Sequence, residues 1–141
     1  MKNPIIRGFH PDPSIIRVKE DYYIATSTFE WFPGVCLYHS RDLEHWEQLP
    51  SPLNRAAQLE MKGNKSSAGV YATCLSYDNG IYYLVYTDTK NHSGLFWDCD
   101  NETGKAHDPA GEWSAPVELD KSGYYPSLYP GHEATKLQGT L

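Results

Sequence analysis

One strand pattern occurs twice in this chain, and this repeat sets the strongest limit on how the chain can fold. The first copy pairs residues 14–18 with residues 21–28, and the second pairs residues 74–77 with residues 81–88 across the turn Asp78-Asn79-Gly80. Both members of each pair are rich in β-branched and aromatic residues, which favour strands, so each copy predicts a β-hairpin. Asn-Gly is the preferred pair for a two-residue hairpin turn of type I′.

A second half follows each hairpin. Residues 37–49 and residues 108–119 both combine a polar turn, a tryptophan and a short strand-forming run. Each unit therefore predicts four antiparallel strands, the first over about residues 12–50 and the second over about residues 70–120. Within the second unit, residues 101–105 are polar and predict a poor strand. Repeated four-stranded units are typical of β-propeller blades, and a β-sandwich built of hairpins is the alternative all-β architecture.

The pattern begins a third time and then stops. Residues 126–129 repeat the start of the first copy, but residues 130–141 contain no Tyr-Tyr strand. We therefore expect a partial propeller over residues 1–129 and an unrelated tail over residues 130–141. A propeller closes with roughly four to eight blades. Two blades alone leave open sheet edges, through which copies of the chain are able to associate.

Composition argues against several classes of partner. The chain carries 12 Lys and Arg against 18 Asp and Glu, for a net charge of −6, and has no basic run, so nucleic acid is not an expected partner. It has no apolar run long enough to span a membrane and no secretory signal. Its three cysteines lack CxxC spacing. These features together predict a cytoplasmic protein.

The histidines do not suggest a metal site. None of the six shows the paired spacing of metal ligands, so no metal or other cofactor is expected. His39 and His45 lie on either side of a polar turn, where we expect both rings to be solvated.

The segment from His10 to Ser14 holds a candidate catalytic carboxylate. Asp12 lies between Pro11 and Pro13, and a proline favours extended geometry in the residue before it. An extended Asp12 on a stiff lead-in to a strand is well placed to act as a base, whereas a solvated Pro-Asp-Pro turn is the alternative. An aromatic run, residues 29–32, precedes a Pro-Gly turn, and such rings either pack in the core or face a ligand such as a sugar.

Three segments, residues 8–14, 21–34 and 52–55, resemble the amino-terminal part of a β-xylosidase of glycoside hydrolase family 43. The resemblance implies a five-bladed β-propeller with a central active site, of which this chain would hold the first two blades and the start of a third. It also implies inverting hydrolysis of xylo-oligosaccharide ends, with release of α-L-arabinofuranose by many members. Inversion needs two carboxyls about 6.5–9.5 Å apart, one to activate water and one to protonate the leaving oxygen.

The same resemblance gives roles to individual residues. Asp12 occupies the position of the general base. The positions matched to substrate-binding residues are Phe29, Tyr71, Ala72 and Tyr124. The chain departs from the family at Tyr71, where the family has Trp, and at Tyr125, where the family has an acid that tunes the proton donor. A phenol has a pKa of about 10 and carries no charge at neutral pH. No residue matches the family's general acid.

Two functions are compatible with these residues. The first is a glycoside hydrolase of the β-xylosidase type, whose activity in this chain alone is expected to be weak or absent because the general acid is missing. The second is a non-catalytic sugar-binding remnant, or a remnant without function. A carboxylic acid held opposite Asp12 would distinguish the first from the second.

Overall fold

The computed structural model describes residues 3–89 and 100–119, and these residues form two antiparallel four-stranded sheets. The first sheet has the order β1-β2-β3-β4 and the second the order β5-β6-β7-β8. The strands are β1 (Ser14–Val18), β2 (Asp21–Ser27), β3 (Val35–Ser40), β4 (Glu47–Leu49), β5 (Val70–Asp78), β6 (Ile81–Asp88), β7 (Asp100–Ala106) and β8 (Val117–Leu119). Within the described residues, no helix has the length and apolar character needed to cross a bilayer.

Both predicted hairpins are present. β1 and β2 are paired along their length, starting at the turn with Val18 opposite Asp21. β5 and β6 are paired in the same way, starting with Asp78 opposite Ile81. In the second hairpin, Asn79 has a φ of 48° and Gly80 a φ of 84°. Positive φ at both central residues is what a type I′ turn requires, so the predicted turn is confirmed.

The prediction of a poor strand at residues 101–105 is wrong, because these residues lie within β7. The strand pairs with β6 over its whole length and with β8 over residues 101–103. Hydrogen bonding to neighbours on both sides stabilises a strand whose own residues have little preference for one, since strand propensity depends strongly on context.

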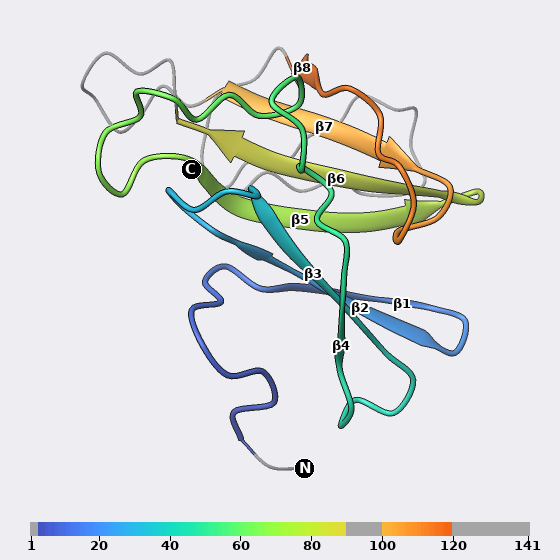
Figure 1. Ribbon diagram of the computed structural model, residues 1–141. Coiled ribbons are helices and arrows are strands. Elements are labelled where there is room, and N and C mark those ends of the chain that lie inside the picture. The colour runs from blue at the N-terminus through green and yellow to red at the C-terminus, as the bar shows by residue number, and fades with distance from the viewer. Residues whose placement is uncertain (1–2, 90–99, 120–141) are drawn as a thin grey trace, which may run out of the picture.

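The two sheets lie as separate layers, and β5 of the second lies beside β1 and β2 of the first (Figure 1). The side chains buried between the layers come from both sheets, as in Tyr23 of β2 against Tyr82 of β6, whose ring centroids are 5.4 Å apart. The core consists of Val18, Tyr23, Ala25, Val35, Leu37, Leu53, Leu59, Val70, Leu75, Tyr82, Leu84, Tyr86, Ala106 and Trp113. One hydrophobic core therefore joins both sheets.

The connection between the sheets, residues 50–69, is part of this core. In Figure 1 it runs from β4 across the second sheet to the region of β8 before it returns to β5. Leu53 and Leu59 are buried, and between them the chain makes one turn, in which Leu59 N donates to Arg55 O at 3.1 Å. The side chain of Gln58 donates to the carbonyl oxygens of Trp113 and Ser114 at 3.1 and 3.2 Å. These contacts tie the connection to the tryptophan turn of the second sheet.

Candidate active site

Asp12 lies where the two sheets meet, and each sheet contributes a hydrogen bond to its carboxylate. The hydroxyl of Ser27, the last residue of β2, donates to Asp12 Oδ2 at 2.9 Å. The backbone N–H of Ala72, in β5, donates to the same oxygen at 3.1 Å. Asp12 is half-buried. The carboxylate is therefore fixed to both sheets and is not a solvated turn residue.

The backbone around Asp12 is held in the same way. Ser27 N donates to Pro11 O at 3.0 Å, and the Thr73 hydroxyl lies 3.4 Å from Asp12 O. Each sheet thus supplies one contact from the main chain and one from a side chain. Both sheets therefore hold the segment before β1 in place at Asp12.

The prediction that Asp12 is extended is wrong, because its φ is 51°. Aspartate adopts the left-handed region more readily than most residues, since its short polar side chain can bond locally. Here the hydrogen bonds from both sheets offset the cost of that conformation. Phe29, with a φ of 52°, and Ala72, with a φ of 49°, are also left-handed. Such strained backbone positions cluster at functional sites.

An irregularity in β5 explains how Ala72 reaches Asp12. The register with β6 shifts between Tyr71 and Cys74, so that two residues of β5 lie opposite one residue of β6. This is a β-bulge, which disrupts the ladder locally and redirects the groups within it. At the bulge, the Ala72 N–H points to the Asp12 carboxylate instead of pairing with β6.

Aromatic rings gather next to Ala72, one of the residues that hold this carboxylate. Phe29 and Tyr71 have ring centroids 4.4 Å apart, and Phe9 packs edge-on against Phe29 at 5.2 Å. Phe29 is held by a pair of backbone hydrogen bonds to Val70, at 3.0 and 3.1 Å. Phe9 is 57% exposed. Aromatic faces next to an acceptor carboxylate are suited to a sugar, whose C–H groups pack on rings while its hydroxyls form hydrogen bonds.

His10 supports the same segment from the side of the first sheet. Its Nε2 lies 3.0 Å from Arg7 O, and since a carbonyl only accepts, Nε2 is the donor. Its Nδ1 lies 3.4 Å from the Tyr38 hydroxyl. Burial raises the pKa of Tyr38 to about 12, so that hydroxyl stays protonated and is able to donate to His10.

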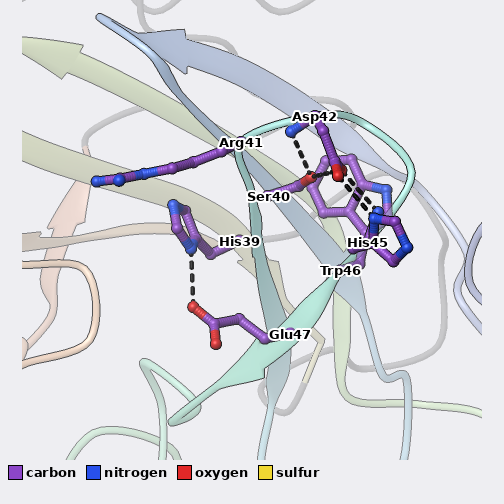
Figure 2. Close-up of a pocket in the computed structure, with 7 residues that line it drawn as sticks. All are labelled: His39, Ser40, Arg41, Asp42, His45, Trp46 and Glu47. Atoms are coloured by element: carbon purple, nitrogen blue, oxygen red, sulfur yellow. Dashed lines mark hydrogen bonds and ion pairs between the residues drawn. The ribbon is translucent and has the colours of Figure 1, made fainter.

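A hollow lies at the other end of the first sheet, and none of the candidate site residues lines it. It is lined by His39, Ser40, Arg41, Asp42, His45, Trp46 and Glu47 (Figure 2). His39 pairs in register with Tyr23, four residues along β2 from Ser27. At about 3.3 Å per residue, this places the hollow roughly 13 Å along the strand from the Asp12 contact.

His39 in this hollow is an ion-paired residue, so the prediction that it is solvated is wrong. Its side chain is only 19% exposed, and its ring nitrogens lie 2.7 Å from Asp21 and 2.8 Å from Glu47. Burial opposes its charge, but the hydrogen bonds to the two carboxylates outweigh burial and raise the pKa of His39. The same contact from His39, together with Arg41, lowers the pKa of Asp21. His45 also pairs with a carboxylate, Asp42, at 2.6 Å, but its side chain is 87% exposed, so the prediction that it is solvated is confirmed.

The structure brings four of the predicted site residues together: Asp12, Phe29, Tyr71 and Ala72. Tyr124 and Tyr125 lie outside the described residues, as do residues 120–141, which include the predicted third copy and tail. Sequence reasoning missed Ser27, for which the only signal is a run of small hydroxyl residues at the end of β2. Within the described residues, no group of three or more His, Cys, Asp or Glu side chains is arranged to hold a metal.

Comparison of the whole chain with known families gives the class of protein to which it belongs. The model of glycosyl hydrolases family 43 matches residues 1–136, and the chain belongs to this family. The resemblance in the sequence motifs is thereby confirmed.

Individual relatives come from this family's β-xylosidases and arabinosidases. The chain is 52% identical over 136 residues to Xylosidase/arabinosidase 43B of Humicola insolens. This alignment covers 96% of this chain and 25% of that protein. It is 50% identical over 134 residues to Beta-xylosidase of Bacillus subtilis (strain 168), and this alignment covers 95% of this chain and 25% of that protein. The crystal structure of xylan beta-1,4-xylosidase from Bacillus halodurans C-125 matches with a TM-score of 0.88 and 55% identity, over 95% of this chain and 26% of that one. The chain thus spans about a quarter of the length of these relatives.

Proposed function

We propose that this chain supplies the base-bearing part of the active site of an inverting β-xylosidase-type glycoside hydrolase. The two sheets would be the first two blades of a five-bladed propeller, in a partial domain that extends to about residue 129. The proposed substrates are the ends of xylo-oligosaccharides, with α-L-arabinofuranosides as a side activity. The names of the relatives, which include both xylosidases and arabinosidases, support this choice.

The observation that carries the proposal is the geometry of Asp12. Both hydrogen bonds that the described residues make to its carboxylate go to Oδ2, which leaves Oδ1 to accept a proton from water. An inverting hydrolase needs such a base on one face of the sugar and a proton donor on the other. Phe29, Tyr71, Ala72 and Tyr124 would bind the terminal sugar on the side of the base.

The carboxyl group that protonates the leaving oxygen would come from elsewhere in the intact enzyme. No residue of this chain matches the general acid, so we expect the acid to belong to the part of the enzyme that corresponds to the rest of the relatives' length. Tyr125, at the position of the acid that tunes the proton donor, would supply hydrogen bonding without charge. We therefore expect the isolated chain to hydrolyse xylosides weakly or not at all.

The decisive experiment is a fusion that restores the missing part. Residues 1–128 of this chain would replace the matching amino-terminal quarter of the Bacillus subtilis β-xylosidase, and release of p-nitrophenol from p-nitrophenyl β-D-xyloside would be followed. We expect the fusion to be active and Asp12→Asn to lower kcat by about 10²–10⁴, the usual contribution of a general base. Asp108→Asn, which removes a carboxylate from an exposed turn, is the matched control and should leave kcat unchanged. A folded fusion in which Asp12→Asn has no effect would refute the proposal.

The alternative is a sugar-binding remnant without catalysis, and the same rings beside Asp12 favour it as a second candidate. In that case the intact chain would bind xylose, seen as a change in tyrosine and tryptophan fluorescence that Tyr71→Ala removes, while the folded fusion would remain inactive.

Two further parts of the proposal concern the location and the assembly of the chain: a cytoplasmic location and self-association through open sheet edges. Sedimentation at several concentrations tests self-association.

A further inference from the structure

We propose that Ser27 is the positioning residue of the catalytic base, and that its hydroxyl fixes the plane of the Asp12 carboxylate so that Oδ1 faces the reacting water. The inference rests on the proposed role of Asp12 as the base. Nothing in the sequence motifs or the comparisons gives Ser27 a role.

The first argument is the double attachment of Ser27 to the segment that carries the base. Its N–H donates to Pro11 O at 3.0 Å and its hydroxyl donates to Asp12 Oδ2 at 2.9 Å. Ser27 is fully buried at the end of β2, where pairing with Val35 of β3 fixes its backbone. A buried hydroxyl on a paired strand has little freedom, so it holds its partner in one orientation.

The second argument is that the two donors to the carboxylate act on one oxygen from different directions. Ala72 N approaches Oδ2 from the second sheet, at 3.1 Å, and the Ser27 hydroxyl approaches from the first, at 2.9 Å. One donor alone leaves the carboxylate free to rotate about its last side-chain bond, which is a soft torsion. Two donors from separate sheets fix it, and a catalytic group must be held within a few tenths of an ångström to act efficiently.

The first test uses the fusion enzyme. Ser27→Ala should lower kcat by about 10–100-fold, because a mispositioned base loses part of its contribution, while KM changes less than about two-fold. Ser27→Thr keeps the hydroxyl and should restore most of kcat. A residue with a merely structural role would not be rescued in this way.

Thr28→Val provides the matched control. Thr28 is also buried, one residue further along, and its hydroxyl donates to Gly34 O at 2.6 Å without touching Asp12. We expect this variant to lower the melting temperature about as much as Ser27→Ala does but to leave kcat unchanged. If Ser27→Ala and Thr28→Val have the same kcat, the positioning role is refuted.

A second measurement uses the intact 141-residue chain and needs no activity. Ser27→Ala should lower the melting temperature in the wild-type background but much less in an Asp12→Ala background, because the hydrogen bond is already absent there. Equal shifts in both backgrounds would overturn the inference. If Asp12→Asn has no effect on the fusion, the proposed function fails; if Asp12→Asn abolishes activity and Ser27→Ala does not reduce it, only the inference about Ser27 fails.

Discussion

Replacing Gly69 with alanine tests how the aromatic part of the site is attached to the second sheet. Gly69 has a φ of 149°, which residues with a side chain rarely adopt, and a Cβ at this position would lie 2.0 Å from Phe29 O. That oxygen accepts a hydrogen bond from Val70 N at 3.0 Å, and Phe29 N donates to Val70 O at 3.1 Å. The added methyl group therefore forces the bridge between Phe29 and Val70 to open.

The expected loss of stability follows from these contacts. Each backbone hydrogen bond contributes about 0.5–1.5 kcal/mol net. The unfavourable φ costs about 1–3 kcal/mol in addition. Opening both hydrogen bonds of the bridge and adopting this φ should together lower the free energy of unfolding of Gly69→Ala by about 2–6 kcal/mol. The ring contact between Phe29 and Tyr71, whose centroids are 4.4 Å apart, should loosen as well.

The assay is urea unfolding of the intact chain, followed by tryptophan fluorescence. The matched control is Gly63→Ala, because Gly63 also has a positive φ, 85°, but a Cβ there would meet nothing within 4 Å. This control should cost only about 1–2 kcal/mol, the backbone penalty of a left-handed residue with a side chain. If Gly69→Ala costs no more than Gly63→Ala, the bridge does not fix the Phe29 loop and the reasoning is wrong.

Three further predictions concern the rest of the described structure. The ion pairs with Asp21 and Glu47 raise the pKa of His39 above 6.5. The stability that these ion pairs contribute should therefore be complete below about pH 6.5 and be lost as the pH rises through the raised pKa of His39. His39→Gln should therefore flatten the melting temperature between about pH 6 and 9, and an unchanged slope would contradict this. Leu37→Ala, at a fully buried core position, should lower the free energy of unfolding by about 2–5 kcal/mol in a urea titration, and a loss below about 1 kcal/mol would mean that the core is loosely packed there. Gln58→Ala removes two hydrogen bonds to the segment between β7 and β8 and should speed proteolytic cleavage within residues 50–69; an unchanged cleavage rate would show that the connection is held by other contacts.

The hairpins could be predicted from the sequence because their determinants are local. Strands rich in β-branched and aromatic residues and an Asn-Gly turn leave few other conformations open, and Asn79 and Gly80 adopt the predicted geometry. The repeat predicts a third strand in the second unit, but the polar residues 101–105 gave it no local support, because this strand is stabilised by its neighbours β6 and β8 and not by its own residues.

The candidate site also has one feature that the sequence predicted and others that it did not. The sequence singled out Asp12 by its proline neighbours and motif, but the local rule for residues before proline gave the wrong backbone conformation. Hydrogen bonds from Ser27, Ala72 and Thr73, which lie 15, 60 and 61 residues away, hold Asp12 in place. No local pattern describes contacts of that range.

The sequence by itself determined the all-β class, the two four-stranded units and the family, because each of these depends on residues close together in the chain or on a motif read in order. Only the tertiary structure decided the chemistry of the site. The bulge in β5 turns the Ala72 N–H toward Asp12, and the packing of β5 beside β1 and β2 brings that N–H within 3.1 Å of the carboxylate. The physical reason is that a carboxylate is oriented by hydrogen-bond donors that approach it from several directions. A single stretch of chain supplies donors from one direction only.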